Sequence, residues 1–424
     1  MGVRDEDSFE FHAEGLFGVF VIVRLPSYTT MVSKPLQKIV PRRALVRILL
    51  FTDTLGDANG VSRFVTDMGR EAQESQGELH IFGSTLKKRY ESALYIHNEK
   101  PFWRFRMPFY PELDLAIPPF WRFWSLAKEL NPDIIHISTP GFVGLCGRII
   151  AKRLGKPLCG TYHTDFPAYI MENTQSSFLK RLSIRCLRWF YAPFSRLLLR
   201  SMTHSRELFE ELRIEPSRVG VIQAGIDLTR FGPRFRDRTI WKEWGLCMNA
   251  PKALYVGRLN KEKNFLFLLE AWRELKAHYA KPLELVVVGE GEFSGALADE
   301  DLDIHYLGFK GGEELSKIYA SSDFFLFPSR TDTLGQAVME ACASGLPAVV
   351  SDEGGPKEIV SMTQSGYILD AKNHKAWKEA IIHLAQEPLV REEWGKRGAS
   401  AMLSLGIRRS WESFYKEHQK VPLV

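Results

Sequence analysis

Short apolar runs alternate with longer stretches of helical periodicity from Ala44 onward. Such alternation predicts βαβ units, in which parallel strands form a sheet and helices cover its faces. A helix is predicted over Phe142–Leu154, which Gly155 would end in a left-handed conformation. In the first half of the chain we expect strands at Leu45–Phe51, Leu79–Phe82, Asp133–Ile137, Leu158–Tyr162 and Val219–Ile222.

The same pattern begins again near Lys252. The second set of predicted strands is Ala253–Val256, Leu283–Val288, Ile304–Leu307, Phe324–Phe327, Ala348–Val350 and Tyr367–Leu369. Two open sheets are therefore expected, each with ligand-binding loops at the carboxyl ends of its strands. Two such edges facing one another form a cleft suited to a two-substrate reaction.

These patterns suggest domain boundaries. We expect an extension of unknown role at 1–43, a first domain at 44–222 and a second domain at 223–405, with a hinge at Gln223–Asp227. A C-terminal helix over 406–424 is expected to pack back on the first domain.

Composition narrows the class of protein. Hydrophobic residues make up 45% of the 424 residues, which is enough to build real cores. The net charge of +5 is too mild for a protein dedicated to nucleic acid. The five cysteines include no CxxC pair, which argues against a zinc site or a disulfide framework. The apolar stretch Gly15–Val23 is too short to cross a bilayer and follows an acidic start, so we expect a cytoplasmic protein.

The strongest candidate for chemistry follows the predicted strand Phe324–Phe327. A polar loop leads into a helix that begins near Gly335, where free backbone N–H groups could bind a diphosphate or sugar hydroxyls. Asp332 lies in the loop and Glu340 lies one to two turns into the helix. Carboxylates at this separation can each accept a pair of vicinal hydroxyls, one pair on a hexose and one on a ribose. The alternative is that Asp332 only caps the helix and Glu340 faces solvent.

The segment Ser329–Glu340 resembles the acid-x7-acid motif of retaining glycosyltransferase family 4. That resemblance implies the GT-B fold, an α/β architecture of two doubly wound Rossmann-like domains facing across a cleft. It also implies that Asp332, where most relatives carry Glu, contacts the donor sugar with help from the backbone of Thr333, Leu334 and Gly335. Glu340 would hold the nucleotide ribose.

Three other segments resemble motifs of the same family. Val256–Asn264 matches its Gly-Arg-Leu-x-x-Glu-Lys loop, which implies that Arg258 and Lys263 neutralise a leaving diphosphate. Taken alone, this loop could equally be a solvated turn. The His-Thr-Asp-Phe-Pro-x-Tyr segment implies that His163 contacts the donor hexose, and it offers Tyr162, Asp165 and Tyr169 on the acceptor side. Asn59–Gly60 resembles the glycine loop of the first domain, where a missing side chain lets the diphosphate approach closely.

The resemblance spans about Leu45–Ile368 and implies transfer of a hexose from a nucleoside diphosphate sugar with retention of configuration. His163, Arg258, Lys263 and Asp332 are the candidate catalytic residues. We expect no cofactor and no essential metal, because Arg and Lys can replace it and no Asp-x-Asp pair adjoins a diphosphate site. The sequences of the Tyr-His loop and of the Thr-Asp-Thr-Leu-Gly segment most resemble those of lipid-directed mannosyl- and sulfoquinovosyl-type transferases. This resemblance implies a lipid acceptor.

Other function classes fit less well. A nucleotide-sugar epimerase of the same fold, or a transferase with a soluble acceptor, remains an alternative. The Gly-x-Gly at Gly289–Gly291 lacks the spacing of a dinucleotide site, and its two glutamates would repel a pyrophosphate. A degenerate, non-enzymatic scaffold is disfavoured because Arg258, Lys263, His163 and Glu340 are all present.

Basic and aromatic residues gather in the first domain. Phe178–Arg200 contains six basic residues and no acidic one, and Pro101–Arg106 and Pro119–Trp124 interleave aromatics with arginine. This combination predicts peripheral binding to an anionic membrane surface, at the inner face of the cell membrane. The alternative is a packed helix with a solvated basic face, and Pro193 argues against one uninterrupted helix. The arginines at helical spacings are Arg181, Arg185, Arg188, Arg196 and Arg200.

Overall fold

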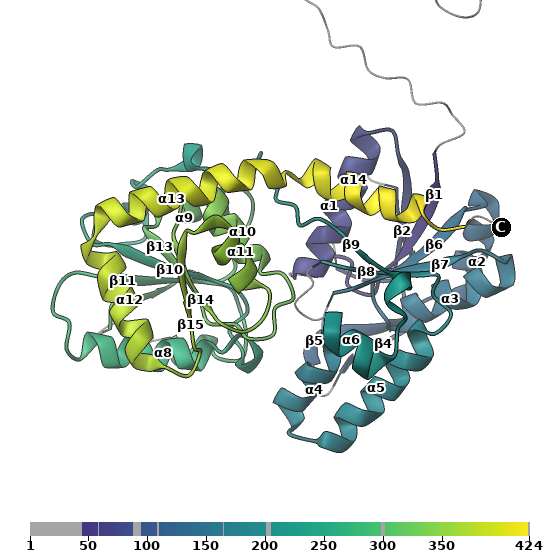
Figure 1. Ribbon diagram of the computed structural model, residues 1–424, viewed down its shortest axis with the longest axis horizontal. Helices are drawn as coiled ribbons and strands as arrows, with labels where there is room; N and C mark the ends of the chain where they lie inside the picture. Colours follow the sequence, from purple (N-terminus) through teal and green to yellow (C-terminus); the bar gives the residue numbers. More distant parts are fainter. Residues whose placement is uncertain are drawn as a thin grey trace, which may run out of the picture. The chain divides into compact units, whose positions relative to one another are not determined.

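The computed structural model describes residues 45–57, 59–87, 95–107, 110–163, 165–200, 205–297 and 302–422. The extension predicted at 1–43 lies outside this part of the chain. Leu45–Val424 forms one compact unit that contains two parallel sheets (Figure 1). We call the larger sheet with its packed helices the N-terminal lobe, and the smaller sheet with its helices the C-terminal lobe.

The sheet of the N-terminal lobe has seven strands in the order β3-β2-β1-β6-β7-β8-β9, all parallel. All five predicted strands are present, while β3 and β8 were not predicted. An antiparallel hairpin, β4 (Trp103–Met107) with β5 (Tyr110–Ile117), was also not predicted. The strands of the sheet are β1 (Arg47–Phe51), β2 (Glu78–Gly83), β3 (Ile96–Asn98), β6 (Ile134–Ile137), β7 (Leu158–Tyr162), β8 (Arg196–Leu199) and β9 (Val219–Val221).

Several helix ends of this lobe are capped by residues of the local sequence. The Asn59 side chain accepts hydrogen bonds from the Val61 and Ser62 amides at 3.1 and 2.9 Å and begins α1. Gly155, with φ of 65°, ends α3 as predicted. The helices are α1 (Gly60–Glu74), α2 (Phe120–Leu130), α3 (Phe142–Leu154), α4 (Phe166–Thr174), α5 (Ser177–Tyr191) and α6 (Ser205–Leu212).

The stretch Phe178–Arg200 corrects one prediction. Arg181, Arg185 and Arg188 lie on α5, but α5 ends at Tyr191 and Arg196 begins the buried strand β8. The proline after α5 has no amide hydrogen to donate, and the apolar run Leu197–Leu199 fits a central parallel strand. Arg196 and Arg200 therefore do not belong to a helical basic face.

The sheet of the C-terminal lobe has six parallel strands in the order β12-β11-β10-β13-β14-β15. Every one coincides with a predicted apolar run. Its core holds the fully buried rings of Trp241, Trp272 and Trp377. The strands are β10 (Lys252–Val256), β11 (Glu284–Val288), β12 (Ile304–Tyr306), β13 (Phe324–Phe327), β14 (Ala348–Ser351) and β15 (Gly366–Leu369). The helices are α7 (Ile240–Glu243), α8 (Phe265–Lys276), α9 (Gly312–Ser321), α10 (Gln336–Ala343), α11 (Pro356–Thr363), α12 (His374–Gln386) and α13 (Pro388–Met402).

The last helix, α14 (Ile407–Gln419), packs on the N-terminal lobe beside α1 (Figure 1). Phe414 is fully buried, and its ring meets those of Phe64 and His136 at centroid distances of 6.0 and 5.1 Å. The Glu417 carboxylate pairs with the Arg196 guanidinium at 2.5 Å. The boundaries 44–222, 223–405 and 406–424 remain our proposal for the domains, and the two sheets and this helix support it.

Within the described residues, no helix is both long and apolar enough to span a bilayer.

Candidate active site

A cavity of about 550 Å³ lies between the lobes, at the carboxyl ends of their strands. Loops that follow β1, β6 and β7 line it from the N-terminal lobe, and loops that follow β10 and β13 line it from the C-terminal lobe. This is the edge at which doubly wound sheets bind ligands. Of the predicted site residues, those on its lining are Asn59, Gly60, Tyr162, His163, Asp165, Tyr169, Arg258, Lys263, Asp332, Thr333, Leu334 and Gly335.

Asp332 and Lys263 form an ion pair on the side of the C-terminal lobe. The Lys263 Nζ lies 2.8 Å from both carboxylate oxygens of Asp332. Burial alone would raise the pKa of Asp332, but the charge and hydrogen bonds of Lys263 outweigh it and hold that pKa below its ordinary value. Asp332 is therefore an ionised acceptor at neutral pH.

Arg258 lines the same side of the cavity and is also paired with a carboxylate, that of Glu262. The glutamate is 5% exposed and lies in a short turn after β10. Both cations that the sequence assigned to a diphosphate thus have acidic partners within the C-terminal lobe. Fixed partners of this kind hold the cations in place at the cavity wall.

The helix α10 begins at the cavity because Gly335 adopts a φ of 81°, which L side chains rarely take. A Cβ at this position would also lie 2.8 Å from the Pro356 side chain. The turn places Thr333, Leu334 and Gln336 on the cavity lining beside free amides of the helix start. The sequence predicted that the helix begins near Gly335.

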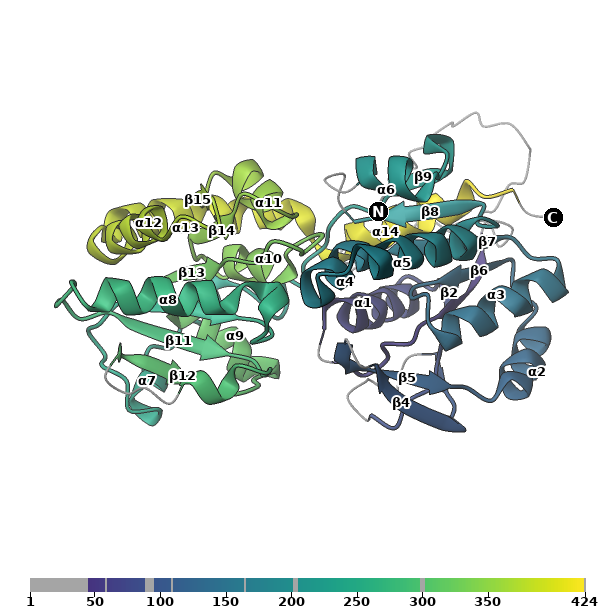
Figure 2. The same ribbon diagram turned by 90° about the horizontal axis from the view of Figure 1, so that it is seen from below.

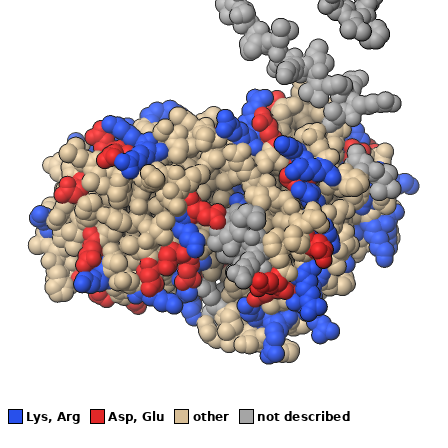
Figure 3. All heavy atoms as spheres, in the orientation of Figure 1, with Lys and Arg blue, Asp and Glu red and all other residues tan. Residues whose placement is uncertain are grey.

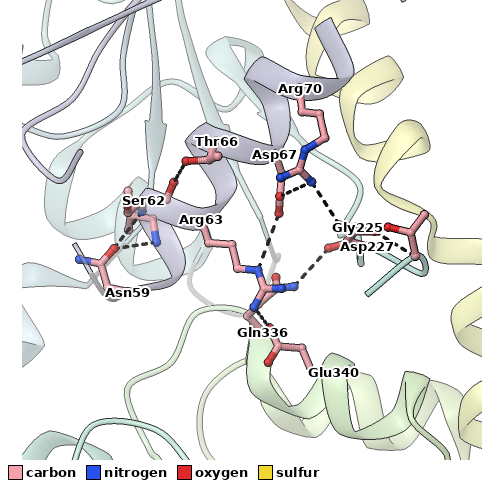
Figure 4. A network of polar contacts seen from close by, with 12 residues as sticks. Asn59, Ser62, Arg63, Thr66, Asp67, Arg70, Gly225, Asp227, Gln336 and Glu340 are labelled. Atoms are coloured by element: carbon pink, nitrogen blue, oxygen red, sulfur yellow. Dashed lines mark hydrogen bonds and ion pairs between the residues drawn. The ribbon is translucent and has the colours of Figure 1, made fainter. Parts of the chain in front are cut away.

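Glu340 lies deeper along α10 and is not on the cavity lining. It is 4% exposed, and its carboxylate pairs with the guanidinium of Arg63, which reaches across from α1 (Figure 4). The predicted contact of Glu340 with a ribose therefore remains a prediction. Arg63 was not singled out from the sequence, because it is 277 residues from its partner.

The same network joins α1 to the hinge. Arg70 pairs with Asp227 at 3.1 Å and with Asp67 at 3.5 Å (Figure 4). Burial raises the pKa of Asp67 to about 6, although Arg63 and Arg70 oppose the rise. Helix α1 is therefore tied by charge to both the hinge and α10.

His163 connects the two lobes. Its Nε2 lies 3.0 Å from the Ser138 hydroxyl, and its backbone carbonyl accepts a hydrogen bond from the Thr333 hydroxyl at 2.7 Å. Burial, and then the nearby Arg200, lower the pKa of His163 well below its ordinary value. The imidazole is therefore neutral at physiological pH, and its Nδ1 has no partner among the described residues.

Gly60 is exposed at the start of α1, and a Cβ there would meet no atom within 4 Å. The space beside it is thus open to a ligand. On the neighbouring wall, Tyr162 and Tyr169 are buried, and the Asp165 carboxylate accepts a hydrogen bond from the Ala168 amide at 3.1 Å and caps α4. These three residues, predicted on the acceptor side, lie together at the start of α4.

Asp53 is a buried carboxylate of the N-terminal lobe that the sequence analysis did not select. It lines the cavity, but its oxygens accept hydrogen bonds from the Thr139 hydroxyl at 2.8 Å and the Val143 amide at 2.8 Å. The amides of Gly141 and Gly144 also donate to it, at 3.0 and 3.3 Å. Asp53 therefore fixes the start of α3.

The cavity continues into an apolar region of the N-terminal lobe, which we call the apolar arm. Side chains from β5, α3, α4 and α5 form it, and Figure 2 shows α4 and α5 side by side. Trp189 is 60% exposed at its rim, where the Arg148 guanidinium lies 3.8 Å from the ring centroid. The residues of the apolar arm are Leu115, Phe142, Leu145, Phe166, Cys186, Leu187, Trp189 and Phe190.

Other exposed apolar side chains occur on α5 and at the start of β4. On α5, Phe178 and Leu182 are 68% and 46% exposed; Phe102, just before β4, and Trp103, its first residue, are 79% and 70% exposed. Arg181 and Arg185 are exposed on α5, and Figure 3 shows basic groups gathered over this helix at the lower edge of the view. These features leave a basic and aromatic surface around α5.

Arg200 was assigned to the outer basic face from the sequence, which is wrong. It follows β8, is 8% exposed and lines the cavity. Nothing in its sequence context distinguishes it from the surface arginines of α5, since its burial depends on the strand that precedes it.

Within the described part of the chain, no group of three His, Cys, Asp or Glu side chains could hold a metal ion. The metal-free chemistry expected from the sequence stays a prediction.

Comparison with known proteins places these features in context. A family model described as Glycosyltransferase Family 4 matches residues 58–230, and one described as Glycosyl transferases group 1 matches residues 237–401. The chain is 27% identical to a GDP-mannose-dependent alpha-mannosyltransferase of Mycobacterium tuberculosis over 86% of its own length and 93% of that protein. It is 31% identical to the sulfoquinovosyl transferase SQD2 of Arabidopsis thaliana, over 62% of its own length and 51% of that protein.

The fold also matches solved structures. The sucrose-phosphate synthase from Thermosynechococcus elongatus superposes with a TM-score of 0.72 at 16% identity, covering 88% of this chain and 99% of the other. At this identity, the likeness supports the architecture of two facing Rossmann-like lobes.

Proposed function

Since the chain belongs to glycosyltransferase family 4 and has the GT-B fold, we propose that it transfers a hexose from a nucleoside diphosphate sugar to a membrane lipid with retention of configuration. The observation that carries this proposal is the division of the cavity into a charged end and an apolar arm. The polar donor would bind at the charged end, and the partly apolar acceptor would bind in the apolar arm.

At the charged end, Asp332 would accept hydrogen bonds from donor-sugar hydroxyls, with the backbone of Thr333, Leu334 and Gly335 alongside. Lys263 and Arg258 would face the diphosphate, where negative charge grows as the glycosidic phosphate bond breaks. Cations already fixed beside that charge stabilise the transition state without further reorganisation. Asn59 and Gly60 would border the diphosphate from the opposite lobe.

The proposed reaction is a front-face displacement. The acceptor hydroxyl oxygen bonds to the anomeric carbon on the face from which the diphosphate leaves, and the bond from that carbon to the phosphate oxygen breaks. The departing phosphate oxygen takes the hydroxyl proton. His163 is neutral, and its Nδ1 has no partner within the described ranges; it would hydrogen-bond the hexose. No metal is required in this scheme, because the two cations provide the positive charge.

At the other end, the apolar arm would take the hydrocarbon part of the acceptor. Tyr162, Asp165 and Tyr169 lie where its hydroxyl-bearing head would pass. The basic and aromatic surface around α5 suits the headgroup layer of an anionic membrane. We therefore place the protein at the cytoplasmic membrane surface, as a peripheral protein.

A lipid-dependence assay tests the function. The protein is incubated with a panel of labelled uridine and guanosine diphosphate sugars, with and without membrane lipid extract, and the organic phase is counted. We expect label in the lipid fraction for at least one donor, only when lipid is present. An isomerised sugar nucleotide formed without lipid would instead indicate an epimerase. Label transferred only to water-soluble compounds would refute the lipid acceptor.

A further inference from the structure

Three basic side chains line the described part of the cavity: Arg200, Arg258 and Lys263. The last two are paired with Glu262 and Asp332, as described above. Arg200 has no carboxylate within ion-pair distance among the described residues; Asp67 attracts it only from farther away. Of these three cations, Arg200 is therefore the one whose positive charge is not balanced by a paired carboxylate of the described residues.

Arg200 is held without being neutralised. Its Cζ lies 4.6 Å from the centroid of the Phe64 ring, and its Nη2 donates to the Gln336 side-chain oxygen at 3.3 Å. Its Nε has no hydrogen-bond partner among the residues that the structure describes. A guanidinium carries five N–H donors, so most of its hydrogen-bonding capacity is unused.

Burial lowers the pKa of Arg200 to about 10, so the group stays charged at neutral pH. A buried charge without a counter-ion is costly to the folded state. Such a residue is expected where a ligand supplies the missing negative charge.

The surroundings of Arg200 favour an oxyanion. Gln336 is the first residue of α10, whose free amides face the same cavity. The neutral His163 also contacts Phe64, edge to face, with ring centroids 5.1 Å apart. A planar guanidinium matches two oxygens of a phosphoryl group in a bidentate manner.

We propose that Arg200 forms a phosphoryl-binding subsite on the N-terminal wall of the cavity. The inference rests on the proposed transferase function and adds to it a third cation that the family motifs do not include. Two substrates carry this chemistry: the diphosphate of the donor and the phosphate of an anionic lipid acceptor.

Calorimetric titration distinguishes these sources. The probes are UDP and GDP for the donor, and dihexanoyl phosphatidic acid, a short-chain soluble lipid, for the acceptor. We expect Arg200→Met to weaken binding of at least one probe class by about 10-fold or more. Loss confined to the nucleotides assigns the subsite to the donor, and loss confined to the phosphatidic acid assigns it to the acceptor. Unchanged affinity for all probes overturns the proposal.

Arg153→Met serves as a matched control, because Arg153 also stacks on aromatic rings, those of Phe120 and Trp124, but lies outside the cavity lining. It should bind every probe like the wild type. Thermal unfolding provides a second readout: Arg200→Met should unfold at or above the wild-type temperature, because it removes an unpaired buried charge. A markedly lower temperature with unchanged binding would show a structural role and overturn the proposal.

Should Arg200→Met fail to fold, Arg200→Lys carries the same test. It keeps the charge but loses the bidentate fork, so weaker binding of one probe class is expected and wild-type affinity overturns the subsite. Lys263→Ala is titrated alongside. Nucleotide binding lost in Lys263→Ala but intact in the Arg200 variants, with phosphatidic acid also intact, removes only the subsite. Failure of the wild type to bind either nucleotide removes the proposed function.

Discussion

The two lobes keep their ionisable groups at the cavity in different ways. In the C-terminal lobe, Lys263 and Arg258 are each joined to a carboxylate of the same lobe. The N-terminal lobe instead presents a neutral His163, an Arg200 without a carboxylate at ion-pair distance in the described part of the chain, and an apolar arm. One wall is thus organised before any ligand arrives, while the other leaves hydrogen-bonding and apolar capacity for a ligand to fill. This contrast is what we expect if the donor binds to the C-terminal wall, whose groups are already paired, and the acceptor binds to the N-terminal wall.

The largest expected effect comes from removing one of the paired cations of the C-terminal lobe. Lys263→Ala should lower turnover by about 100-fold or more, the scale for losing one transition-state donor. The measurement is initial rate at saturating donor. Lys261→Ala is the matched control, because Lys261 is exposed in the same turn and is not on the cavity lining. Turnover close to wild type in Lys263→Ala would remove the diphosphate assignment.

The second prediction is that acid destabilises the N-terminal lobe through two buried histidines. In the N-terminal lobe, His136 Nδ1 lies 3.0 Å from His418 Nε2, and His418 Nδ1 donates to the Phe414 carbonyl at 2.7 Å. Burial lowers the pKa of His418 to about 4 and that of His136 well below its ordinary value. The unfolded chain therefore binds these protons more readily. This contribution to stability is complete above the unfolded pKa of about 6.5 and is lost as the pH falls toward 4.

At pH 5 the loss from His418 alone amounts to about 2 kcal/mol, or roughly 5 °C in unfolding temperature. Scanning calorimetry at pH 7.5 and pH 5 measures it. His418→Gln, which does not titrate, should show a shallower dependence on pH. An equally steep profile in that variant would show that the histidine pair is not responsible.

A charge introduced into the apolar arm of the N-terminal lobe tests whether the arm binds the acceptor. Leu145→Asp should lower kcat/KM for a lipid acceptor by about 10-fold, because the carboxylate must be desolvated when a hydrocarbon chain binds. Nucleotide affinity should not change. Ile149→Asp is the control, one turn later on α3, 38% exposed and outside the cavity lining. Equal losses in both variants would point to damage of the helix rather than of the arm.

The smallest effect concerns the membrane surface. Arg181→Gln on α5 should weaken binding to anionic vesicles about 5-fold, at about 1 kcal/mol for one basic residue near the surface. Flotation with anionic and neutral lipids at low and high salt measures it. Arg408→Gln on α14 removes the same charge from another surface and should bind like the wild type. Negligible wild-type binding to both vesicle types would refute peripheral membrane association.

The contrast between the lobes also explains what the sequence could predict. Five of the six strands of the C-terminal sheet have at least four residues and are mostly apolar, so they were found. The sixth, β12, has only three residues, but the apolar Ile304 and Leu307 indicated it. In the N-terminal lobe, β3 has only three residues, two of them the polar His97 and Asn98. The alternation Trp-Arg-Phe-Arg-Met of β4 is typical of a strand with one exposed face, but the sequence analysis interpreted it only as a basic and aromatic surface. The start of α10 was predicted because its loop and helix are local in sequence. The pairing of Arg63 with Glu340 and the burial of Arg200 depend on tertiary packing, which no local pattern encodes.

The position of α14 constrains how the protein can be made. Phe414 and Trp411 complete the hydrophobic core beneath α1, although most of that lobe is encoded before residue 222. During synthesis, the core of the N-terminal lobe therefore stays partly exposed until the whole C-terminal lobe and α14 have left the ribosome. The C-terminal lobe can complete its own fold once α13 has emerged. The lobe translated first is the last to be finished.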